Sequence, residues 1–590
     1  MKKIMKMNKI KLLEYIDLDT QSEPEYIDSE ECVSEDVETY SADFETTTDV
    51  NDCRVWAWGL ENINTNEFEY GNTIETFFER IKNKRIDIYF HNLKFDGEFI
   101  IHYLLKNGFK FVSESKDLKE NCFTTLITDL GIFYCIEICY AVYKKSRMSV
   151  KIYDSLKLFP FSVDKVAKSF DMPINKLEID YKEYREVGHE LTEEEISYLK
   201  NDVEIVAVAL KRFKEKGLNR MTLGSNALSS FKDIISTDRF KEYFPLLNCD
   251  KEIRLSYKGG FTYANPKFKD KIIGEGIVLD VNSLYPSVMY YEKLPIGVPI
   301  MGEGKYEKDG VYNLYVQCFS CSFKLKENKI PTVQLKNSLA FCPTDYIEDS
   351  DDEYPTLVMT NVDFELFLEQ YYVYDIEYHW YYKFQSSDSL FKPYIDKWMN
   401  EKIEAEKHNN MGMRLIAKLM LNNLYGKFAT NPKVANKEPY LLDDVVKYKI
   451  VKKEDREPLY VAVGSFITSY ARNKTIRSAQ SVYDRFLYAD TDSLHLIGTE
   501  IPDNLEVDKY KLGAWKHEST FTKAKYIRAK SYIEEIDGKL NVVCAGMPKQ
   551  CHSQVTFDNF VVGATFDGKL RYKHCAGGIV LVDTPFTIKE

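Results

Sequence analysis

The sequence predicts an α+β protein of several domains. Its 590 residues are enough for about three or four domains, and an apolar fraction of 44% is typical of a folded chain with a large core. Apolar residues alternate in some segments and recur at helical spacing in others, along the whole chain. Strands and helices are therefore expected in every domain. No apolar run approaches the roughly 18 residues that a membrane-spanning helix needs, so no transmembrane segment is expected.

Residues 1–39 are predicted to form an acidic, flexible N-terminal extension. All five lysines of residues 1–40 precede residue 12, and 11 acidic residues with no basic one follow up to residue 39. A polar stretch without apolar periodicity buries too little surface to fold by itself. Five lysines minus 11 acids give −6 of the net charge of −13. A basic nucleic-acid groove is therefore compatible with the rest of the chain.

The twelve cysteines are spread over the whole sequence. The one CxxC pattern joins Cys318 to Cys321 and has no second pair of ligands nearby, whereas a zinc site needs four. Free thiols are therefore expected.

The first ordered strand is predicted over residues 40–48. Because strand side chains alternate between two faces, Asp43 and Glu45 project to the same side. A buried strand is predicted from residue 88; it breaks into a loop, and Asp96 follows ahead of a helix. Two separated segments thus offer three carboxylates.

A helix is predicted over residues 197–206, where Tyr198 and Asp202 are four residues apart and share one face. With the three carboxylates above, Asp202 completes a set that suits two divalent cations. Such a pair lowers the pKa of an attacking water and stabilises the in-line displacement at a phosphate. Tyr198 would orient the water. Taken singly, each acid is equally compatible with an ordinary surface charge.

Tyr257, Gly259 and Gly260 belong to a stretch in which two adjacent glycines stand between aromatic residues. Glycines permit the close approach of a backbone to a ligand such as a phosphate chain. An ordinary hairpin turn explains the stretch equally well, and both interpretations stay open.

An apolar strand over residues 277–280 ends at Asp280. The chain leaves this strand through residues 282–286, whose exposed backbone N–H groups, next to an acid, suit a metal–triphosphate complex. Residues 292–389 are too numerous for a loop and are predicted to form an inserted subdomain. A second, shorter insertion is predicted over residues 431–459.

Residues 391–428 have a helical pattern with one polar and one apolar face. Two cations and a flat aromatic ring on one face suit a triphosphate and a stacked base, and a merely solvated face is the alternative. The polar face consists of Arg414, Lys418, Asn422 and Tyr425.

Residues 488–496 are predicted to form a strand, a tight turn and a second strand, with Asp490 and Asp492 at the turn. A short hairpin holds two carboxylates rigidly against a divalent cation, although the pattern alone also suits a solvated loop. Further on, residues 521–532 interleave basic and aromatic side chains. That composition is typical of a strand that contacts a nucleic-acid backbone.

Eight motifs in this order resemble those of family B DNA polymerases, most of all the protein-primed branch of small linear-genome phages, the phi-twenty-nine type. The resemblance covers residues 40–590. The motifs are Asp43-Phe-Glu-Thr, Asn92-Leu-Lys-Phe-Asp96, Tyr198 with Asp202, Tyr257-Lys-Gly-Gly, Asp280-Val-Asn-Ser-Leu-Tyr-Pro286, Lys418-Leu-Met-Leu-Asn-Asn-Leu-Tyr-Gly426, Tyr488-Ala-Asp-Thr-Asp492 and Lys530-Ser-Tyr532.

The resemblance implies an α+β multidomain fold, in which an RNase H-like 3′–5′ exonuclease domain precedes a right-hand polymerase domain with two inserted subdomains. In this branch the first insertion contacts the terminal protein that primes synthesis. The second closes a ring around DNA and gives processivity and strand displacement. The implied ranges are 40–222 for the exonuclease domain, 223–291 and 460–543 for the palm, 292–389 for the first insertion, 390–430 for the fingers, 431–459 for the second insertion and 544–590 for the thumb.

For the exonuclease site, the resemblance implies a set of metal-binding and catalytic residues and a set that holds the single-stranded primer end. Glu178 stands where the family more often has Asp, and Lys176 would support the site. Stacking on two phenylalanines suits an end of any sequence. The metal-binding and catalytic residues are Asp43, Glu45, Asp96, Tyr198, Asp202 and Glu178. The DNA-contact residues are Thr46, His91, Asn92, Phe95, Phe99, Ser155, Leu156 and Tyr181.

For the polymerase site, the resemblance implies metal binding by Asp280, Asp492 and the carbonyl of Val281, with Asp490 alongside. Tyr285 would exclude a 2′-hydroxyl, so that the substrate is dNTP. Lys402, Arg414 and Lys418 would contact phosphates, next to Asn422 and Tyr425 on the same helix, and Lys530 and Tyr532 would grip the primer strand.

The implied activity is that of a DNA-directed DNA polymerase with a proofreading exonuclease and two Mg²⁺ or Mn²⁺ ions in each active site. Its partners would be a DNA primer-template, dNTPs and a terminal protein, with no membrane. It would act as a monomer in the cytoplasm of an infected bacterium. The alternatives are an exonuclease alone, an RNA-templated polymerase or a noncatalytic DNA-binding protein. Retroviral-type palms usually place two acids side by side, whereas Thr491 separates Asp490 from Asp492 here.

Overall fold

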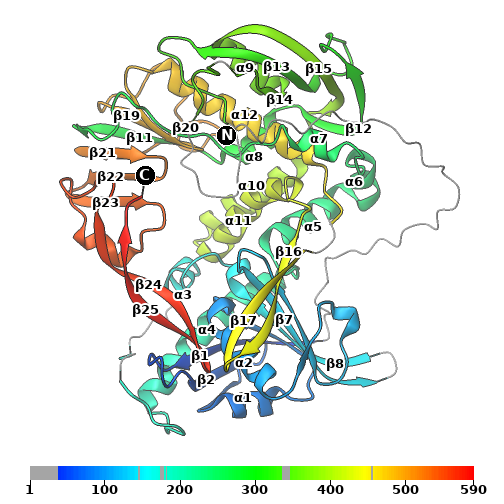
Figure 1. Cartoon of the computed structure of the whole chain (residues 1–590), viewed down its shortest axis with the longest axis vertical. Coiled ribbons are helices and arrows are strands. Elements are labelled where there is room, and N and C mark those ends of the chain that lie inside the picture. The colour runs from blue at the N-terminus through cyan, green and yellow to red at the C-terminus, as the bar shows by residue number, and fades with distance from the viewer. Residues whose placement is uncertain are drawn as a thin grey trace, which may run out of the picture.

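The computed structural model describes residues 37–143, 146–172, 179–180, 183–334, 346–351, 353–452 and 456–589. The acidic extension up to residue 36 lies outside the described residues, as do Lys176, Glu178 and Tyr181 of the implied exonuclease site. The chain forms a lower lobe, which is the N-terminal domain, and an upper lobe that contains most of the remaining elements (Figure 1).

The N-terminal domain is built on an eight-stranded sheet in the order β3-β2-β1-β4-β8-β7-β6-β5. β1 pairs in parallel with β4, and β4 with β8, and all five residues of β4 are buried, as expected for the centre of a sheet that is covered on both faces. The strands are β1 (Glu38–Thr46), β2 (Val55–Asn62), β3 (Phe68–Gly71), β4 (Ile86–Phe90), β5 (Lys110–Phe111), β6 (Cys122–Ile127), β7 (Phe133–Tyr143) and β8 (Ser146–Asp154). The helices are α1 (Ile74–Ile81), α2 (Leu93–Lys106), α3 (Val163–Ser169) and α4 (Glu193–Glu215).

A glycine lets α4 lie close over β1 and β2. A Cβ atom at Gly59 would be 2.9 Å from Cγ of Leu199 on α4, and Gly59 is the register partner of Asp43 on β1. The face of α4 that packs here is buried and includes Tyr198 and Asp202. The helix that carries these two residues therefore lies over the strand pair that carries Asp43.

The upper lobe contains a five-stranded sheet in the order β20-β11-β19-β18-β9 and a four-stranded sheet in the order β10-β21-β22-β23. β11 pairs with both β19 and β20, so strands that are about two hundred residues apart in the sequence become neighbours. The first sheet consists of β9 (Thr262–Ala264), β11 (Gly276–Val281), β18 (Phe486–Asp490), β19 (Ser493–Ile497) and β20 (Trp515–Phe521). The second consists of β10 (Ile272–Ile273), β21 (Lys523–Arg528), β22 (Ser531–Ile536) and β23 (Lys539–Cys544).

Helices beside these sheets share an aromatic core, in which the ring of Phe231 on α5 stacks on that of Phe391 at 4.8 Å. This contact joins α5 to the start of α10, which packs against α11. The helices are α5 (Leu223–Ile235), α6 (Thr237–Tyr243), α7 (Asp250–Arg254), α8 (Leu284–Tyr291), α10 (Lys392–Lys407), α11 (Met411–Phe428) and α12 (Val461–Ser481).

The remaining elements interrupt or follow this part of the chain. One group is a four-stranded sheet in the order β12-β15-β13-β14 with one helix. The other two are hairpins, β16 with β17 and β24 with β25. Their bounds are β12 (Leu294–Glu303), β13 (Leu314–Leu325), β14 (Thr356–Thr360), α9 (Asn361–Gln370), β15 (Tyr371–Ser387), β16 (Ala435–Leu442), β17 (Val445–Lys452), β24 (Thr565–Cys575) and β25 (Gly578–Thr587).

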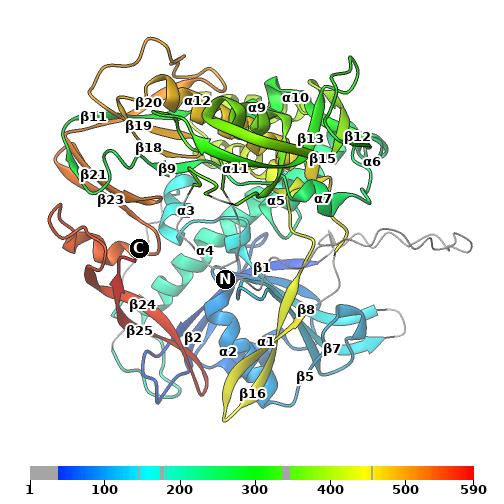
Figure 2. The ribbon, with the colours of Figure 1, turned by 45° about the horizontal axis from the view of Figure 1, so that its top comes forward.

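Both hairpins reach from the upper lobe to α2 of the N-terminal domain (Figures 1 and 2). At the turn of the first hairpin, Asp444 Oδ1 is 3.1 Å from Nε2 of His102 on α2. The Tyr448 hydroxyl of the same hairpin donates to Glu98 at 2.9 Å. At the turn of the second hairpin, the N–H of Gly577 donates to His102 Nε2 at 3.2 Å. One helix of the lower lobe therefore anchors the tips of two elements of the upper lobe.

Three local predictions need correction. Asp96 lies in the first turn of α2 and not ahead of the helix. Residues 391–428 form two helices, because the chain reverses between α10 and α11, where Asn409 has a φ of 53°. Residues 521–532 include two strands, β21 and β22, with Lys530 in the turn at a φ of 55°. The strand at 40–48, the helix at 197–206 and the strand–turn–strand at 488–496 are confirmed.

Within the described part of the chain, none of the helices combines the length and the apolar character that crossing a membrane requires. Cys318 and Cys321 both lie on β13 as buried free thiols.

Candidate active sites

The pairing of β11 with β19 brings Asp280 and Asp492 together. The N–H of Val281 donates to the carbonyl of Asp492 at 2.8 Å, and Asp280 is the register partner of Ser493. Burial, followed by the charge of Asp492, raises the pKa of Asp280 to about 6. Burial also raises the pKa of Asp492. A pair of partly buried carboxylates therefore lies at the ends of two neighbouring strands.

The chemistry of this pair fits a divalent cation. Two partly buried carboxylates with raised pKa values gain stability from a positive partner. Lys516 Nζ is 3.7 Å from Asp280 and balances only part of the charge. Among the described residues, no three His, Cys, Asp or Glu side chains are grouped so as to hold a metal ion. A cation here would therefore combine Asp280 and Asp492 with other oxygens, such as the carbonyl of Val281.

Asp490 has different partners from the other two acids. Its carboxylate accepts a hydrogen bond from the Thr262 hydroxyl at 2.9 Å and pairs with Lys530 Nζ at 3.1 Å. Because Lys530 already balances this charge, the geometry favours Asp280 and Asp492 as the cation pair. The metal role of Asp490 stays a prediction.

Lys402, Arg414 and Lys418 form a cluster of positive charge beside the carboxylate pair. Burial, followed by the charges of Arg414 and Lys418, lowers the pKa of Lys402. Lys418 also acts on Asp280, where its charge offsets part of the rise in pKa. Lys402 belongs to α10 and the other two to α11, so the packing of these helices assembles the cluster. Three cations facing two acids suit a triphosphate held together with a metal ion.

Two tyrosines stack next to this cluster. The rings of Tyr285 on α8 and Tyr425 on α11 are 3.9 Å apart with an interplanar angle of 24°. Burial raises the pKa of both phenols. Asn422 is exposed on the same helix as Tyr425. The predicted face of residues 414–425 therefore lies beside the strand end that carries Asp280.

The two glycines before β9 differ in what surrounds them. A Cβ atom at Gly260 would lie 2.5 Å from Oγ1 of Thr491, the residue between the two acids, and the N–H of Thr491 donates to the carbonyl of Phe261 at 2.6 Å. A Cβ atom at Gly259 would have no neighbour within 4 Å. Gly260 is needed for a close approach, and the group that comes close to it is the side chain of Thr491 in the acidic turn.

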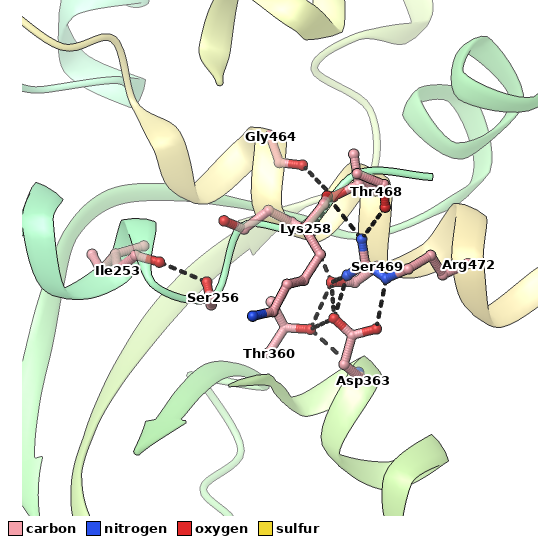
Figure 3. Close-up of polar contacts among 11 residues, drawn as sticks. Ile253, Ser256, Lys258, Thr360, Asp363, Gly464, Thr468, Ser469 and Arg472 are labelled. Atoms are coloured by element: carbon pink, nitrogen blue, oxygen red, sulfur yellow. Dashed lines mark hydrogen bonds and ion pairs between the residues drawn. The ribbon is translucent and has the colours of Figure 1, made fainter. Parts of the chain in front are cut away.

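Arg472 on α12 holds the same loop (Figure 3). Its guanidinium donates to the carbonyls of Lys258 at 2.9 Å and Gly259 at 2.7 Å, and it pairs with Asp363 on α9. The Ser469 hydroxyl donates to the same carboxylate at 2.7 Å. The arginine side chain is 7% exposed, so these charge-assisted bonds are shielded from water. The network ties the first inserted sheet to the loop that supports the acidic turn.

Asp43 and Asp96 form a second acidic cluster in the N-terminal domain. Burial, followed by the charge of Asp43, raises the pKa of Asp96 well above its usual value. Asp96 is 3% exposed, and in the described part of the chain its Oδ1 atom has no hydrogen-bond partner. Glu45 lies on the same side of β1 as Asp43, and the buried Asp202 comes from α4 above this strand. No three of these acids are grouped closely enough in the described structure to hold a metal ion by themselves, but a buried carboxylate oxygen without a partner is a group that a cation would stabilise.

Asp154 shapes this site, and the sequence analysis did not single it out. Its carboxylate accepts from the N–H groups of Asn92 at 3.1 Å and Leu93 at 3.3 Å, at the start of α2, and from the N–H of Leu156 at 3.0 Å. Lys157 pairs with it at 3.0 Å. A carboxylate at a helix N-terminus satisfies free N–H groups and complements the helix dipole. This cap fixes the first turn of α2, which carries Asp96.

Some predicted DNA contacts already have partners within the protein. The ring nitrogens of His91 lie 2.9 Å from the Ser155 hydroxyl and 2.6 Å from the carbonyl of Phe161. Thr46, at the end of β1, and Leu156 are partly exposed. His91 therefore braces the loop, and its contact with DNA stays a prediction.

Phe95 and Phe99 lie beneath the C-terminal hairpin. Phe99 is 1% exposed, and a Cβ atom at Gly578 would lie 2.5 Å from its ring. The ring of Phe95 is 5.6 Å from that of Phe99 and 6.5 Å from that of Tyr572. Phe99 can stack on a base only if the hairpin moves, whereas Phe95 is partly exposed where it lies.

Two charged groups beside Asp280 were also missed by the sequence analysis. Lys516 on β20 is the register partner of Asp280, and the charge of Glu518 raises the pKa values of both Asp280 and Asp492. The pattern of β20 indicates a strand, but no local signal shows which strand it pairs with.

Comparisons with known proteins agree with this architecture. The family model for DNA polymerase type B, organellar and viral, matches residues 78–189 and 178–510. The DNA polymerase of Bacillus phage Nf is 48% identical over 574 residues, covering 93% of this chain and 99% of that protein. The DNA polymerase of Streptococcus phage Cp-1 is 33% identical over 583 residues, covering 93% and 98%.

Solved structures of phi29 DNA polymerase are similar as well. The orthorhombic crystal form has a TM-score of 0.90 at 46% identity, covering 94% of this chain and 100% of that chain. A complex of the same protein with primer-template DNA and incoming nucleotide substrates has a TM-score of 0.89, with the same coverage.

The fold is therefore that of a DNA-directed DNA polymerase with an exonuclease domain and a polymerase domain. The chain belongs to the type B DNA polymerases of organelles and viruses, within the phi29-type phage group. This membership confirms the predicted family and fold class, and it decides against an exonuclease alone and an RNA-templated polymerase.

Proposed function

We propose that this polymerase copies a linear phage genome from a protein primer, and that its N-terminal domain removes misincorporated nucleotides from the 3′ end. The observation that carries the proposal is the presence of two separate acidic clusters. One contains Asp280 and Asp492, and the other contains Asp43 and Asp96. Both combine burial with raised carboxylate pKa values, which is typical of a site that cations complete. Phosphodiester synthesis and hydrolysis are both reactions that such sites support.

In the polymerase site, Asp280, Asp492 and the carbonyl of Val281 would hold two Mg²⁺ or Mn²⁺ ions. Bound ions supply the positive charge that favours ionisation of the primer 3′-hydroxyl and balances the triphosphate. Lys402 and Lys418 bind the phosphate oxygens and withdraw charge as pyrophosphate leaves.

The stacked pair of Tyr285 and Tyr425 forms the floor under the sugar of the incoming nucleotide. The two ring centroids are 3.9 Å apart, and this stacking would keep the Tyr285 ring under the sugar, where it would leave little room for a 2′-hydroxyl. This arrangement supports the choice of dNTPs over NTPs. Lys530 and Tyr532 hold the primer strand.

In the exonuclease site, Asp43, Glu45, Asp96 and Asp202 would hold the second pair of ions. Tyr198 lies one turn before Asp202 on α4 and orients the attacking water. The separation of this cluster from the polymerase site means that a mismatched primer end has to fray and cross between the lobes to be trimmed.

The substrates are a DNA primer-template and dNTPs, by analogy with the phi29 polymerase that has been solved with both. The relatives come from phages of Bacillus and Streptococcus, which supports the cytoplasm of an infected bacterium as the place of action. A single chain contains both clusters, which supports a monomer.

The two insertions account for the priming and processivity functions. The first, with β12 to β15 and α9, contacts the terminal protein. The second, the β16–β17 hairpin, meets α2 together with the β24–β25 hairpin (Figure 2). Elements that join two lobes at their tips can enclose a DNA strand, which would give processivity and strand displacement.

Primer extension on a singly primed circular template tests the two-site scheme. Asp492→Ala should abolish synthesis and spare degradation of a single-stranded 3′ end, whereas Asp43→Ala combined with Glu45→Ala should do the reverse. A folded variant of either kind that loses both activities contradicts the scheme. Incubation with the terminal protein of the same genome and labelled dNTP, without an oligonucleotide, tests protein priming. A labelled protein band is expected, and its absence would exclude that mode of initiation.

A further inference from the structure

A buried histidine–glutamate pair lies behind the acidic turn. His495 on β19 places Nδ1 2.6 Å from Oε1 of Glu534 on β22, and both side chains are 2% exposed. The Tyr526 hydroxyl on β21 donates to the same glutamate oxygen at 2.7 Å. The pair therefore joins the sheet that carries the catalytic acids to the sheet whose strand β22 begins just after Lys530 and contains Tyr532.

The partners keep Glu534 charged although it is buried. Burial raises its pKa, but the charge of His495 and the hydrogen bonds from His495, Tyr526 and Asn541 outweigh this effect and lower the pKa below its usual value. Buried ion pairs contribute little net stability, since apolar side chains of the same size stabilise a core about as well. Such a pair instead fixes how two strands lie relative to each other, because a short hydrogen bond forms only at one distance and angle.

Further contacts between the two sheets around His495 are aromatic. The rings of Tyr488, Tyr526 and Tyr532 lie 5.1, 5.6 and 5.1 Å from the His495 ring. Aromatic faces tolerate offsets in their mutual position. The short hydrogen bond between His495 and Glu534 does not tolerate such offsets, so it selects one position of β22 relative to β19.

The position of β22 controls the residues proposed to hold the primer. Tyr532 and Glu534 are two residues apart and project from the same face of the strand. The N–H of Lys530 donates to the Tyr488 hydroxyl at 2.9 Å, and its Nζ lies 3.1 Å from Asp490. A shift of β22 would therefore displace both primer contacts relative to the catalytic acids.

We infer that His495 and Glu534 are positioning residues for DNA synthesis, which set the register of β22 so that Lys530 and Tyr532 meet the primer end at the right distance from the catalytic acids. The inference rests on the proposed primer contact of Lys530 and Tyr532. Displacement of a reacting group by about 1 Å costs on the order of a hundredfold in rate. Residues that set the position of a strand can therefore have a large effect on the reaction without contacting the substrate.

The set Ser493, His495 and Glu534 also has the residue types of a hydrolytic triad, but its geometry does not favour one. Ser493 Oγ is 3.4 Å from His495 Nε2 and donates to the backbone carbonyl of Asp490. The burial of the other two members leaves an acyl substrate no access. The serine instead extends the bracing from Glu534 to the acidic turn.

The test compares Glu534→Gln and His495→Gln with Glu535→Gln in the full-length protein. Glu535 is the next residue of β22 and projects from the opposite face, and its carboxylate accepts a hydrogen bond from the exposed Thr522 hydroxyl. Both buried variants should raise the Kd for primer-template and lower kcat by roughly tenfold or more. KM for dNTP and the degradation of single-stranded DNA should stay within about twofold. Glu535→Gln should match the wild type in all four.

A double-mutant cycle with Lys530→Ala separates positioning from general stabilisation. If Glu534 acts through the turn at the start of β22 that carries Lys530, Glu534→Gln should cost less than about twofold in kcat when Lys530 is already alanine. Full additivity, or equal losses of synthesis and degradation, would overturn the inference. So would a lowered melting temperature with unchanged kcat and Kd. Failure of the proposed function would appear separately, as a lack of primer extension by the wild type or an intact Kd for primer-template in Lys530→Ala.

Discussion

The backbone N–H of Val281 donates a hydrogen bond of 2.8 Å to the carbonyl of Asp492. This bond joins the ends of β11 and β19 and places Asp280 beside Asp492, although the two acids are far apart in the sequence. The proposed polymerase site therefore depends on the position of a three-residue turn, Asp490 to Asp492. Groups that brace this turn should affect synthesis even where they never touch substrate.

Gly260 is the first such group. In Gly260→Ala, the new Cβ would lie 2.5 Å from Oγ1 of Thr491 and push the turn away from Asp280. We expect kcat for synthesis to fall by about 10- to 100-fold, with degradation unchanged. Gly259→Ala is the matched control, since a Cβ there meets nothing within 4 Å. Adding Thr491→Ala should restore part of the activity, and a lack of any difference between the two glycine variants would contradict the packing argument.

Tyr285 is expected to decide the choice of sugar. In Tyr285→Val, the loss of the ring that stacks on Tyr425 opens space for a 2′-hydroxyl. Shape discrimination of this kind is worth about 10- to 200-fold, so the preference for dNTP over NTP in kcat/KM should drop by a factor in that range. Single-nucleotide extension with dATP and ATP measures it. Retention of the full preference would assign discrimination to another residue.

Cys53 and Cys575 should become linked under oxidising conditions. Cys53 Sγ donates to the carbonyl of Ile579 at 3.6 Å, and Cys575 lies near enough for its charge, in addition to burial, to raise the pKa of Cys53, so the tip of the C-terminal hairpin lies on the N-terminal domain. A small-molecule disulfide would accept two electrons and two protons from the two thiols and leave as two thiols. Burial raises the pKa of Cys53, so the reaction should be slow and faster at high pH.

Peptide mass spectrometry without reduction detects this link. The crosslinked peptide should be present in the wild type and absent in Cys53→Ser and Cys575→Ser. Its absence from the oxidised wild type would show that the hairpin does not stay docked in solution.

Glu61 should destabilise the N-terminal domain at neutral pH. It is 2% exposed, and burial, followed by the charge of Glu204, raises its pKa to about 7. Because the folded state binds this proton more tightly than the unfolded state, its contribution to stability is complete below about pH 4.5 and declines as the pH rises to about 7. Glu61→Gln should therefore stabilise the protein by about 1–3 kcal/mol at pH 8 and change little at pH 4.5.

Thermal unfolding at the two pH values checks the Glu61 prediction. Glu67→Gln, at an exposed position in the loop just before β3, is the control and should change the melting temperature at neither pH. A gain in Glu61→Gln of the same size at both values would indicate a packing effect in place of a titration.

Much of the local structure was predictable from the sequence because side-chain periodicity is a local property. The alternation in β1 put Asp43 and Glu45 on one side, and helical spacing put Tyr198 and Asp202 on one face. The break between α10 and α11 was missed, since a single residue with positive φ leaves little trace in an otherwise helical pattern. The turn at Lys530 was missed for the same reason.

The pairing of distant segments was not predictable from local patterns. Nothing in the sequence around Asp490 shows that its charge is balanced by Lys530, and nothing in β20 shows that Lys516 faces Asp280. In the sequence, Asp154 is an ordinary residue at the end of a strand. Only the structure shows that its carboxylate caps α2. Each of these relations joins residues from different elements, so only the packed structure contains it.

The sequence by itself determined the order of the motifs, the two sets of acids and the polar face of residues 414–425, because these depend on residue type and short-range spacing. The tertiary structure alone decided which acids share a site, which glycine makes room for the acidic turn, and where the two hairpins end on α2. The physical reason is that strand pairing and domain docking bury surfaces from distant parts of the chain. The free energy of that burial belongs to the pair of surfaces and to neither segment alone.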